Sequence, residues 1–185
     1  MHTEKFIFCL EAISDSEYPE YTTTIQGLEQ LALQGIDSVY NHCDSIEELE
    51  SRLGALVYDD QNFKDYEIIY LVMQGAENTI CLNDYFYSLE EIAELFEGKM
   101  KGKIIHFANA KPLNLTQEEA QYFLDVTGAK AISGYGVNSL SISSWPLDQL
   151  FFTLYQEESD LKLVVELLHR KQYLACQTLD YRMYY

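Results

Sequence analysis

Apolar segments of strand length alternate with amphipathic segments of helix length, and this alternation restricts the fold more than any other feature of the chain. Five segments are typical of strands: Lys5–Ile13, Ser38–His42, Tyr66–Met73, Lys103–Ala108 and Ala129–Ser133. Apolar runs such as YEIIYLVM indicate strands that are covered on both faces. Strands that alternate with helices assemble into a mostly parallel sheet through right-handed crossovers. The sequence therefore predicts an α/β fold with helices on both faces of the sheet.

The helices between these strands are predicted by their start and stop signals. A Ser or Thr followed three residues later by Glu forms a capping box, and three such pairs begin helices at Ser45, Ser88 and Thr116. Gly98 marks the end of the helix that begins at Ser88, and Gly128 marks the end of the helix that begins at Thr116. Further helices are predicted over three ranges, which are Thr22–Gln34, Pro146–Gln156 and Asp160–Lys171.

Two shorter segments complete the predicted topology. Thr79–Leu82 is a β-like piece, and Asn83–Asp84 after it is typical of a turn. Leu174–Tyr184 is interpreted as a last strand, which would be the sixth of the sheet. No repeat, linker or low-complexity tract interrupts the chain, so residues 1–185 are predicted to form one domain.

The charge balance limits the partners that this chain can bind. It has 30 acidic and 12 basic residues, which give a formal net charge of −18 at pH 7. A chain without a basic stripe cannot displace counterions from a phosphate backbone, so nucleic acid is excluded as a partner. A cationic partner fits this charge, although a solvated acidic surface is its commoner meaning.

No export leader, membrane helix or metal motif is recognised, so we expect a cytoplasmic protein without a metal or other cofactor. The first residues are not a basic region followed by a leader-like apolar stretch, and no segment has the roughly 20 apolar residues of a membrane helix. The cysteines show neither a CxxC pair nor zinc-type spacing, which is typical of reduced thiols. They are Cys9, Cys43, Cys81 and Cys176.

Four loops at the carboxyl ends of the predicted strands are the expected place for a ligand site. Doubly wound sheets bind ligands beyond these strand ends, where the strand order reverses. The loops are Glu11–Ser14, Gln74–Asn78, Asn109–Pro112 and Gly134–Asn138.

Segments from four predicted strands resemble a known fold family. FIFCLE, YEIIYLVMQG, GKIIHFANA and TGAKAISGYG are similar to the caspase-like (clan CD) cysteine peptidases. More closely, they resemble a small bacterial family of uncharacterised caspase-like domains related to the CHAT proteases. The resemblance implies a three-layer sandwich with a mostly parallel six-stranded sheet. It also implies a third strand that ends in His-Gly and a fourth that ends in a small residue followed by Cys. In that family the His acts as general base or orienting acid, and the Cys is the nucleophile.

At the matching positions this sequence has Gln74 before Gly75, and Ala110 after Asn109. Glutamine does not exchange a proton near neutral pH, and a methyl group cannot attack a carbonyl carbon. The resemblance with both residues replaced therefore implies a catalytically inactive, pseudo-peptidase domain. An engineered Ala110 in a trapped peptidase is the alternative, and the accompanying Gln74 favours a natural pseudoenzyme.

Three hypotheses for the function remain open at this point. The first is a non-catalytic domain that binds a peptide or partner protein, with an acidic rim that favours basic side chains. Its predicted binding residues are Glu11, Gln74, Gly75, Asn109, Ala110 and Tyr135. The second is an enzyme of another class that uses Cys81 or the pair Glu11 and Glu77. The third is a regulatory subunit that forms a homodimer through the last strand.

Other combinations of reactive residues carry weaker signals. His42 and Cys43 are adjacent in a strand, so their side chains point to opposite faces and do not form a dyad. His106 lies inside a strand and is interpreted as a buried core histidine. The serines of NSLSISS are interpreted as helix-capping residues, because the chain has no GxSxG motif.

Overall fold

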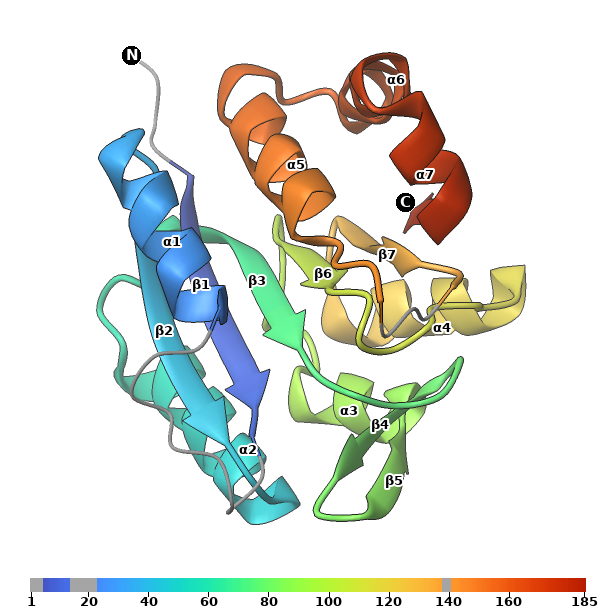
Figure 1. Cartoon of the computed structure of the whole chain (residues 1–185). Helices are drawn as coiled ribbons and strands as arrows, with labels where there is room; N and C mark the ends of the chain where they lie inside the picture. The colour runs from blue at the N-terminus through green and yellow to red at the C-terminus, as the bar shows by residue number, and fades with distance from the viewer. Residues whose placement is uncertain (1–4, 14–22, 138–140) are drawn as a thin grey trace.

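A six-stranded sheet with the strand order β2-β1-β3-β6-β7-β8 forms the centre of the molecule (Figure 1). The computed structural model describes residues 5–13, 23–137 and 141–185. Neighbouring strands from β2 to β7 pair in parallel, and β8 pairs antiparallel with β7. The predicted mostly parallel six-stranded sheet is therefore confirmed. Its strands are β1 (Phe6–Ala12), β2 (Ser38–Cys43), β3 (Tyr66–Val72), β6 (Ile104–Phe107), β7 (Ala131–Tyr135) and β8 (Tyr181–Tyr184).

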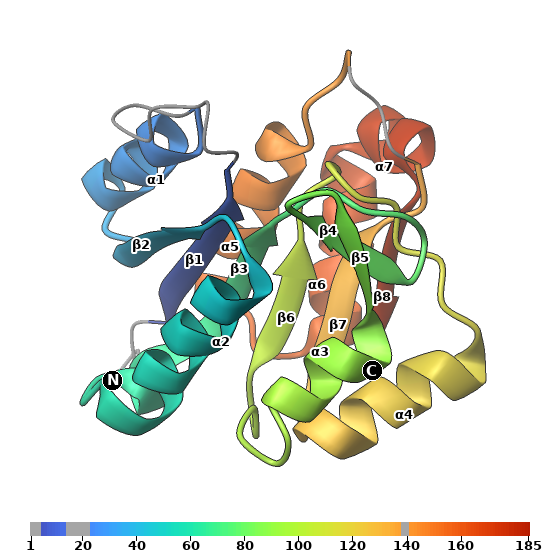
Figure 2. The same ribbon diagram turned by 90° about the horizontal axis from the view of Figure 1, so that it is seen from below.

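Helices cover both faces of the sheet, which makes the fold a three-layer sandwich (Figure 2). No helix within the described residues combines the length and apolar character that crossing a membrane requires. A one-turn 3-10 helix (Phe63–Asp65) leads into β3. One layer contains α2 (Ile46–Gly54), its π-helical continuation (Ala55–Asp59), α3 (Leu89–Leu95) and α4 (Gln117–Thr127). The other layer contains α1 (Thr23–Leu33), α5 (Trp145–Glu157), α6 (Leu161–Lys171) and α7 (Tyr173–Leu179).

Alternate residues of the central strands belong to separate apolar cores on the two faces. In β1, Phe8 and Leu10 lie in the core shared with α2, α3 and α4. Ile7 and Cys9 lie in the core shared with α1, α5, α6 and α7. Because successive side chains of a strand point to opposite faces, a strand between two cores is apolar at consecutive positions. This explains the apolar runs in the sequence.

The predicted helix signals are confirmed at several helix ends. Ser88 and Thr116 form complete capping boxes, and Ser45 accepts a hydrogen bond from the Glu48 N–H. Gly128 ends α4 in the left-handed conformation, with a φ of 75°. Residues 1–4, the helix start predicted at Thr22 and the first three residues of NSLSISS lie outside the described residues.

A β-hairpin between β3 and α3 forms a separate two-stranded sheet (Figure 1). Its strands, β4 (Thr79–Leu82) and β5 (Tyr85–Ser88), pair antiparallel across the turn Asn83–Asp84. Both turn residues have a positive φ, 50° and 64°, as a type I′ turn requires. The predicted β-like piece and turn are therefore confirmed. β5 was not predicted, because YFYS lacks the alternation of apolar and polar residues that marks a half-buried strand.

The prediction of a strand over Leu174–Tyr184 is wrong for its first half. Residues Tyr173–Leu179 form α7, and only Tyr181–Tyr184 form β8. Cys176 and Leu179 are both buried in the core beneath α5 and α6, and their spacing of three places them on one helix face. The helix is only two turns long, so its periodicity is hard to distinguish from that of a strand.

Candidate functional site

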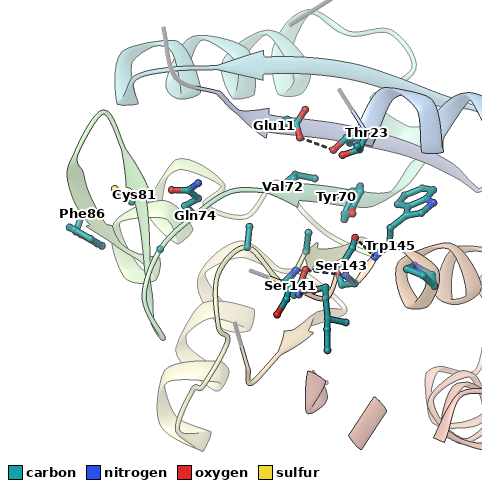
Figure 3. Close-up of a pocket in the computed structure, with 18 residues that line it drawn as sticks. Glu11, Thr23, Tyr70, Val72, Gln74, Cys81, Phe86, Ser141, Ser143 and Trp145 are labelled. Atoms are coloured by element: carbon teal, nitrogen blue, oxygen red, sulfur yellow. Dashed lines mark hydrogen bonds between the residues drawn. The ribbon is translucent and has the colours of Figure 1, made fainter. Parts of the chain in front are cut away.

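A pocket of about 830 Å³ lies at the carboxyl ends of β1, β3 and β6 (Figure 3). Gln74, Cys81 and Phe86 lie at one end of the pocket, and Tyr70 and Trp145 lie at the other. The residues that line it are Glu11, Thr23, Thr24, Tyr70, Val72, Gln74, Gly75, Cys81, Phe86, Ala108, Asn109, Ala110, Ser141, Ile142, Ser143, Ser144, Trp145 and Pro146.

The alternation of side chains along each strand determines which residues reach this pocket. Tyr70, Val72 and Gln74 are two residues apart along the β3 segment, and Ala108 and Ala110 are two apart after β6. Such residues share one face of a sheet. Tyr70 and Ala108 belong to the core beneath α1 and α5. The pocket therefore opens where the strands extend past this helical layer.

Gln74 and Ala110 follow neighbouring strands and line the same pocket. The register of β3 and β6 pairs Leu71 with Phe107. The pairing ends there, since β6 stops at Phe107 and residues 109–110 form a turn, so the lining of the pocket is what Gln74 and Ala110 share. Their side chains bring an amide and a methyl group to this pocket.

Gly75 is required by the close approach of the hairpin. A Cβ at Gly75 would lie 2.1 Å from the Thr79 carbonyl oxygen and 2.9 Å from the Ile80 Cα. The Cys81 N–H also donates to the Gln74 carbonyl at 2.8 Å, which fixes β4 against the end of β3. The steric requirement for glycine at this position is independent of any bound molecule.

Glu11 provides the buried carboxylate of the pocket. The residue is 9% exposed, and its two oxygens accept hydrogen bonds of 2.6 Å from Thr24 Oγ1 and from the Tyr40 hydroxyl. Within the described part of the chain, no lysine or arginine forms an ion pair with it. Burial of a carboxylate without an opposite charge is unfavourable. The geometry therefore suits a cationic group that enters the pocket.

Asn109 holds one wall of the pocket through its side-chain amide. Its Oδ1 accepts from the Ser144 N–H at 3.0 Å, and its Nδ2 donates to the Ile142 carbonyl at 2.6 Å. The Asn109 backbone N–H donates to Ser144 Oγ at 3.0 Å. The sequence predicts Asn109 as a binding residue. In the structure its amide is engaged within the protein, where it fastens residues 141–144 to the end of β6.

Asp148 forms the centre of a buried polar network that was not predicted from the sequence. It is 0% exposed and accepts hydrogen bonds of 2.8 Å from Ser144 Oγ and from the Tyr70 hydroxyl. The Tyr135 hydroxyl also donates to it. Burial, with the nearby Asp148 carboxylate, raises the pKa of Tyr70 and Tyr135 well above the usual value. Both hydroxyls therefore keep the protons that they donate.

His106 connects this network to β7. Its Nε2 lies 2.6 Å from Asp148 Oδ1, and its Nδ1 lies 2.7 Å from Ser133 Oγ. The order Ser133, His106, Asp148 resembles a hydrolytic triad, but all three residues are 0% exposed, so substrate cannot reach the hydroxyl. The interpretation of His106 as a core histidine is confirmed. A sequence signal for Asp148 did exist, because Phe151 and Phe152 follow it at helical spacing and mark a buried face.

Lys111 follows Ala110 and is fully buried. Its Nζ donates to the carbonyl oxygens of Ala76, Glu77 and Pro112 at 2.9, 3.1 and 2.8 Å. Burial lowers the pKa of Lys111 to about 7, and the Glu77 carboxylate opposes this shift. These bonds join the loop after β3 to the loop after β6.

Two residues that the sequence predicts in the site do not line the pocket. Tyr135 belongs to β7, and its side chain is 0% exposed because α5 covers this end of the strand. Glu77 does not line the pocket, so Glu11 and Glu77 do not form a pair across it. Ser14 and Asn138, at the ends of two predicted loops, lie outside the described residues.

Cys81 is the cysteine that lines the pocket, on β4 opposite Phe86. Cys9, Cys43 and Cys176 are buried. Burial raises the pKa of the Cys43 thiol to about 12. This thiol, which follows His42 in the sequence, therefore stays protonated and inert. In the described ranges, no group of three or more His, Cys, Asp or Glu residues is arranged to hold a metal ion.

Comparison with known proteins bears on the fold and on the family. The structure is similar to the crystal structure of caspase-1 from Spodoptera frugiperda, with a TM-score of 0.56, over 94% of this chain and 78% of that one. The sequence identity is 14%, so this similarity shows a caspase-like fold and nothing more. No curated protein matches the sequence. The model of the family described as "Family of unknown function (DUF6642)" matches residues 4–185, and the chain belongs to this family.

Proposed function

We propose that this chain is a caspase-like domain that binds a basic side chain of a peptide or partner protein and does not cleave it. One observation carries the proposal. Glu11 is a buried carboxylate in an open pocket, and it has two hydroxyl donors but no ion-pair partner in the described part of the chain.

The absence of cleavage is inferred from the residues at two strand ends. The caspase-like peptidases that the chain resembles carry His and Cys there, and this chain has Gln74 and Ala110. Cys81 brings a thiol to the pocket, but no histidine is among the described residues that line it. A thiol without a nearby base or cation is a weak nucleophile at neutral pH.

A lysine or arginine side chain fits the charge and the lining of the pocket. Its cationic group would form charge-assisted hydrogen bonds with Glu11, which would replace the hydration that the carboxylate loses through burial. Tyr70 and Trp145, with ring centroids 6.4 Å apart, line the same pocket, and aromatic faces attract cations. The net charge of −18 favours encounter with a basic partner, most strongly at low salt.

Isothermal titration with two peptides tests this proposal. Acetyl-Gly-Gly-Arg-Gly-Gly-amide carries a guanidinium, and the same peptide with citrulline in place of Arg carries a neutral group of the same shape. We expect the Arg peptide to bind about tenfold or more tightly, since a charged hydrogen bond contributes about 1.5–3 kcal/mol. The Glu11→Gln variant should lose most of this preference.

Glu118→Gln is the matched control, because it removes the same charge from an exposed position on α4. It should bind the Arg peptide as the wild type does. Binding of neither peptide by the wild type would refute the proposed function, as would Arg binding by Glu11→Gln at wild-type strength.

The proposed loss of the catalytic pair is tested by restoring it. In the double variant Gln74→His, Ala110→Cys, we expect the imidazole and the thiol to lie within contact distance, because both positions line one pocket. We expect the introduced thiol to react with iodoacetamide faster in the double variant than in Ala110→Cys alone, because the imidazole favours the thiolate. A structure of the double variant with the two side chains more than about 8 Å apart would refute the correspondence of these positions with the peptidase pair.

A further inference from the structure

One wall of the pocket is formed by residues 141–144 and the first turn of α5, and beneath it lies the buried carboxylate of Asp148. Asp148 receives hydrogen bonds from Ser144, Tyr70, Tyr135 and His106. An ionised carboxylate has about four acceptor sites, so its capacity is filled. The donors come from β3, β6, β7 and the N-terminus of α5, so this one group joins three paired strands to the start of that helix.

Two of these donors also line the pocket. Ser144 Oγ donates to Asp148 and accepts from the Asn109 N–H, so it connects the carboxylate to the end of β6, where Asn109 also lines the pocket. The Tyr70 hydroxyl donates to the same carboxylate, which sets the tilt of a ring in the pocket wall. A change at Asp148 therefore moves groups that a ligand would contact.

Trp145 reports on this wall directly. It follows Ser144, lines the pocket, and is the single tryptophan of the chain. Its ring lies against α1, where a Cβ at Gly27 would come within 2.5 Å of two ring carbons. The ring therefore lies between α1 and the network around Asp148, and its exposure changes when either one moves.

We propose that Asp148 is a positioning residue for ligand recognition, which holds the Ser144–Trp145 wall in its binding conformation through the Ser144 hydroxyl. The effect on affinity rests on the proposed function, whereas the effect on the wall does not. Asp148 is 0% exposed and does not line the pocket, so its influence passes through Ser144 and Tyr70, which do.

The experiment compares Ser144→Ala and Asp148→Asn with Ser133→Ala. Ser133 is the matched control, because it is an equally buried hydroxyl of the same network that does not line the pocket. Acrylamide quenching of Trp145 fluorescence measures the wall, and titration with the Arg peptide measures affinity. Urea unfolding measures the stability of each variant.

We expect the quenching constant to rise about twofold or more in Ser144→Ala and Asp148→Asn, and the Arg-peptide affinity to fall about tenfold. Ser133→Ala should lower stability to a similar degree and leave both readouts within about twofold of wild type. Ser144→Ala is the milder variant and decides the test if Asp148→Asn does not fold.

Unchanged quenching in Ser144→Ala, or an equal change in Ser133→Ala, would overturn the inference. The inference would also be overturned if Ser144→Ala showed raised quenching but bound the Arg peptide as tightly as the wild type. If the wild type binds neither peptide, the proposed function fails, and the quenching of the three variants alone decides whether Asp148 positions the wall.

Discussion

At the scale of single residues, Lys111 is a buried cation whose titration links stability to pH. Burial lowers its pKa to about 7 in the folded chain, whereas a lysine in an unfolded chain has a pKa of about 10.4. Between these values the unfolded state binds more protons, so this residue makes the protein more stable as the pH rises through that window. The gain integrates to at most about 5 kcal/mol.

We predict that the free energy of unfolding of the wild type rises relative to that of Lys111→Met from about pH 7 to about pH 10. Methionine has a similar length and no titratable group, so the difference isolates the lysine. Urea unfolding in steps of about one pH unit measures it. A difference that stays constant over this range would show that Lys111 keeps an ordinary pKa.

Gly75 and Gly54 form a contrasting pair of glycines. A Cβ at Gly75 would collide with the Thr79 carbonyl oxygen, whereas a Cβ at Gly54 in α2 has nothing within 4 Å. We predict that Gly75→Ala lowers the free energy of unfolding by about 1–3 kcal/mol, through overpacking against backbone. Gly54→Ala should raise it by about 0.5–1 kcal/mol, because alanine is the better helix former. Thermal unfolding of both variants measures this, and a neutral Gly75→Ala would show that the hairpin moves aside freely.

At the scale of elements, the hairpin β4–β5 depends on a strained turn. Asp84 has a φ of 64°, and left-handed backbone costs a residue with a Cβ about 1 kcal/mol. We predict that Asp84→Gly raises the free energy of unfolding by about 0.5–1 kcal/mol, since glycine is preferred at the second position of type I′ turns. Asp84→Ala should lower it, because alanine lacks the local hydrogen bonds that help aspartate adopt this conformation. Urea unfolding measures both variants, and equal effects of Gly and Ala would exclude backbone strain as the cause.

The strand β8 lies at the edge of the sheet, with β7 as its strand neighbour. An edge strand offers unpaired backbone groups to another strand. A homodimer through β8 therefore stays a proposal, and light scattering tests it against the 21.4 kDa of one chain. A monomer at all accessible concentrations would exclude it.

At the scale of the whole molecule, the net charge of −18 makes the folded chain repel itself. We predict that added sodium chloride raises the melting temperature by a few degrees, because screening relieves this repulsion by roughly 1 kcal/mol or more. Calorimetry at about 0.02 M and about 0.5 M salt measures the shift. A lower melting temperature at high salt would mean that attractive ion pairs outweigh the repulsion.

The sequence by itself determined the layers of this protein. Apolar runs, capping boxes and glycine stops act over a few residues, so β1, β3 and the start of α4 could be read from the chain. The parallel order of the strands and the place of the pocket followed from general rules of α/β topology.

Only the tertiary structure decided which side chains form the site. The Tyr70 hydroxyl and Asp148 are 78 positions apart, and Asn109 and Ser144 are 35 apart. Hydrogen bonds of this kind form only after the sheet and α5 have packed, and no local pattern encodes which partner each group will find. For the same reason Tyr135, predicted in the pocket from its place after a strand, is buried beneath α5, where packing rather than chain position determines exposure.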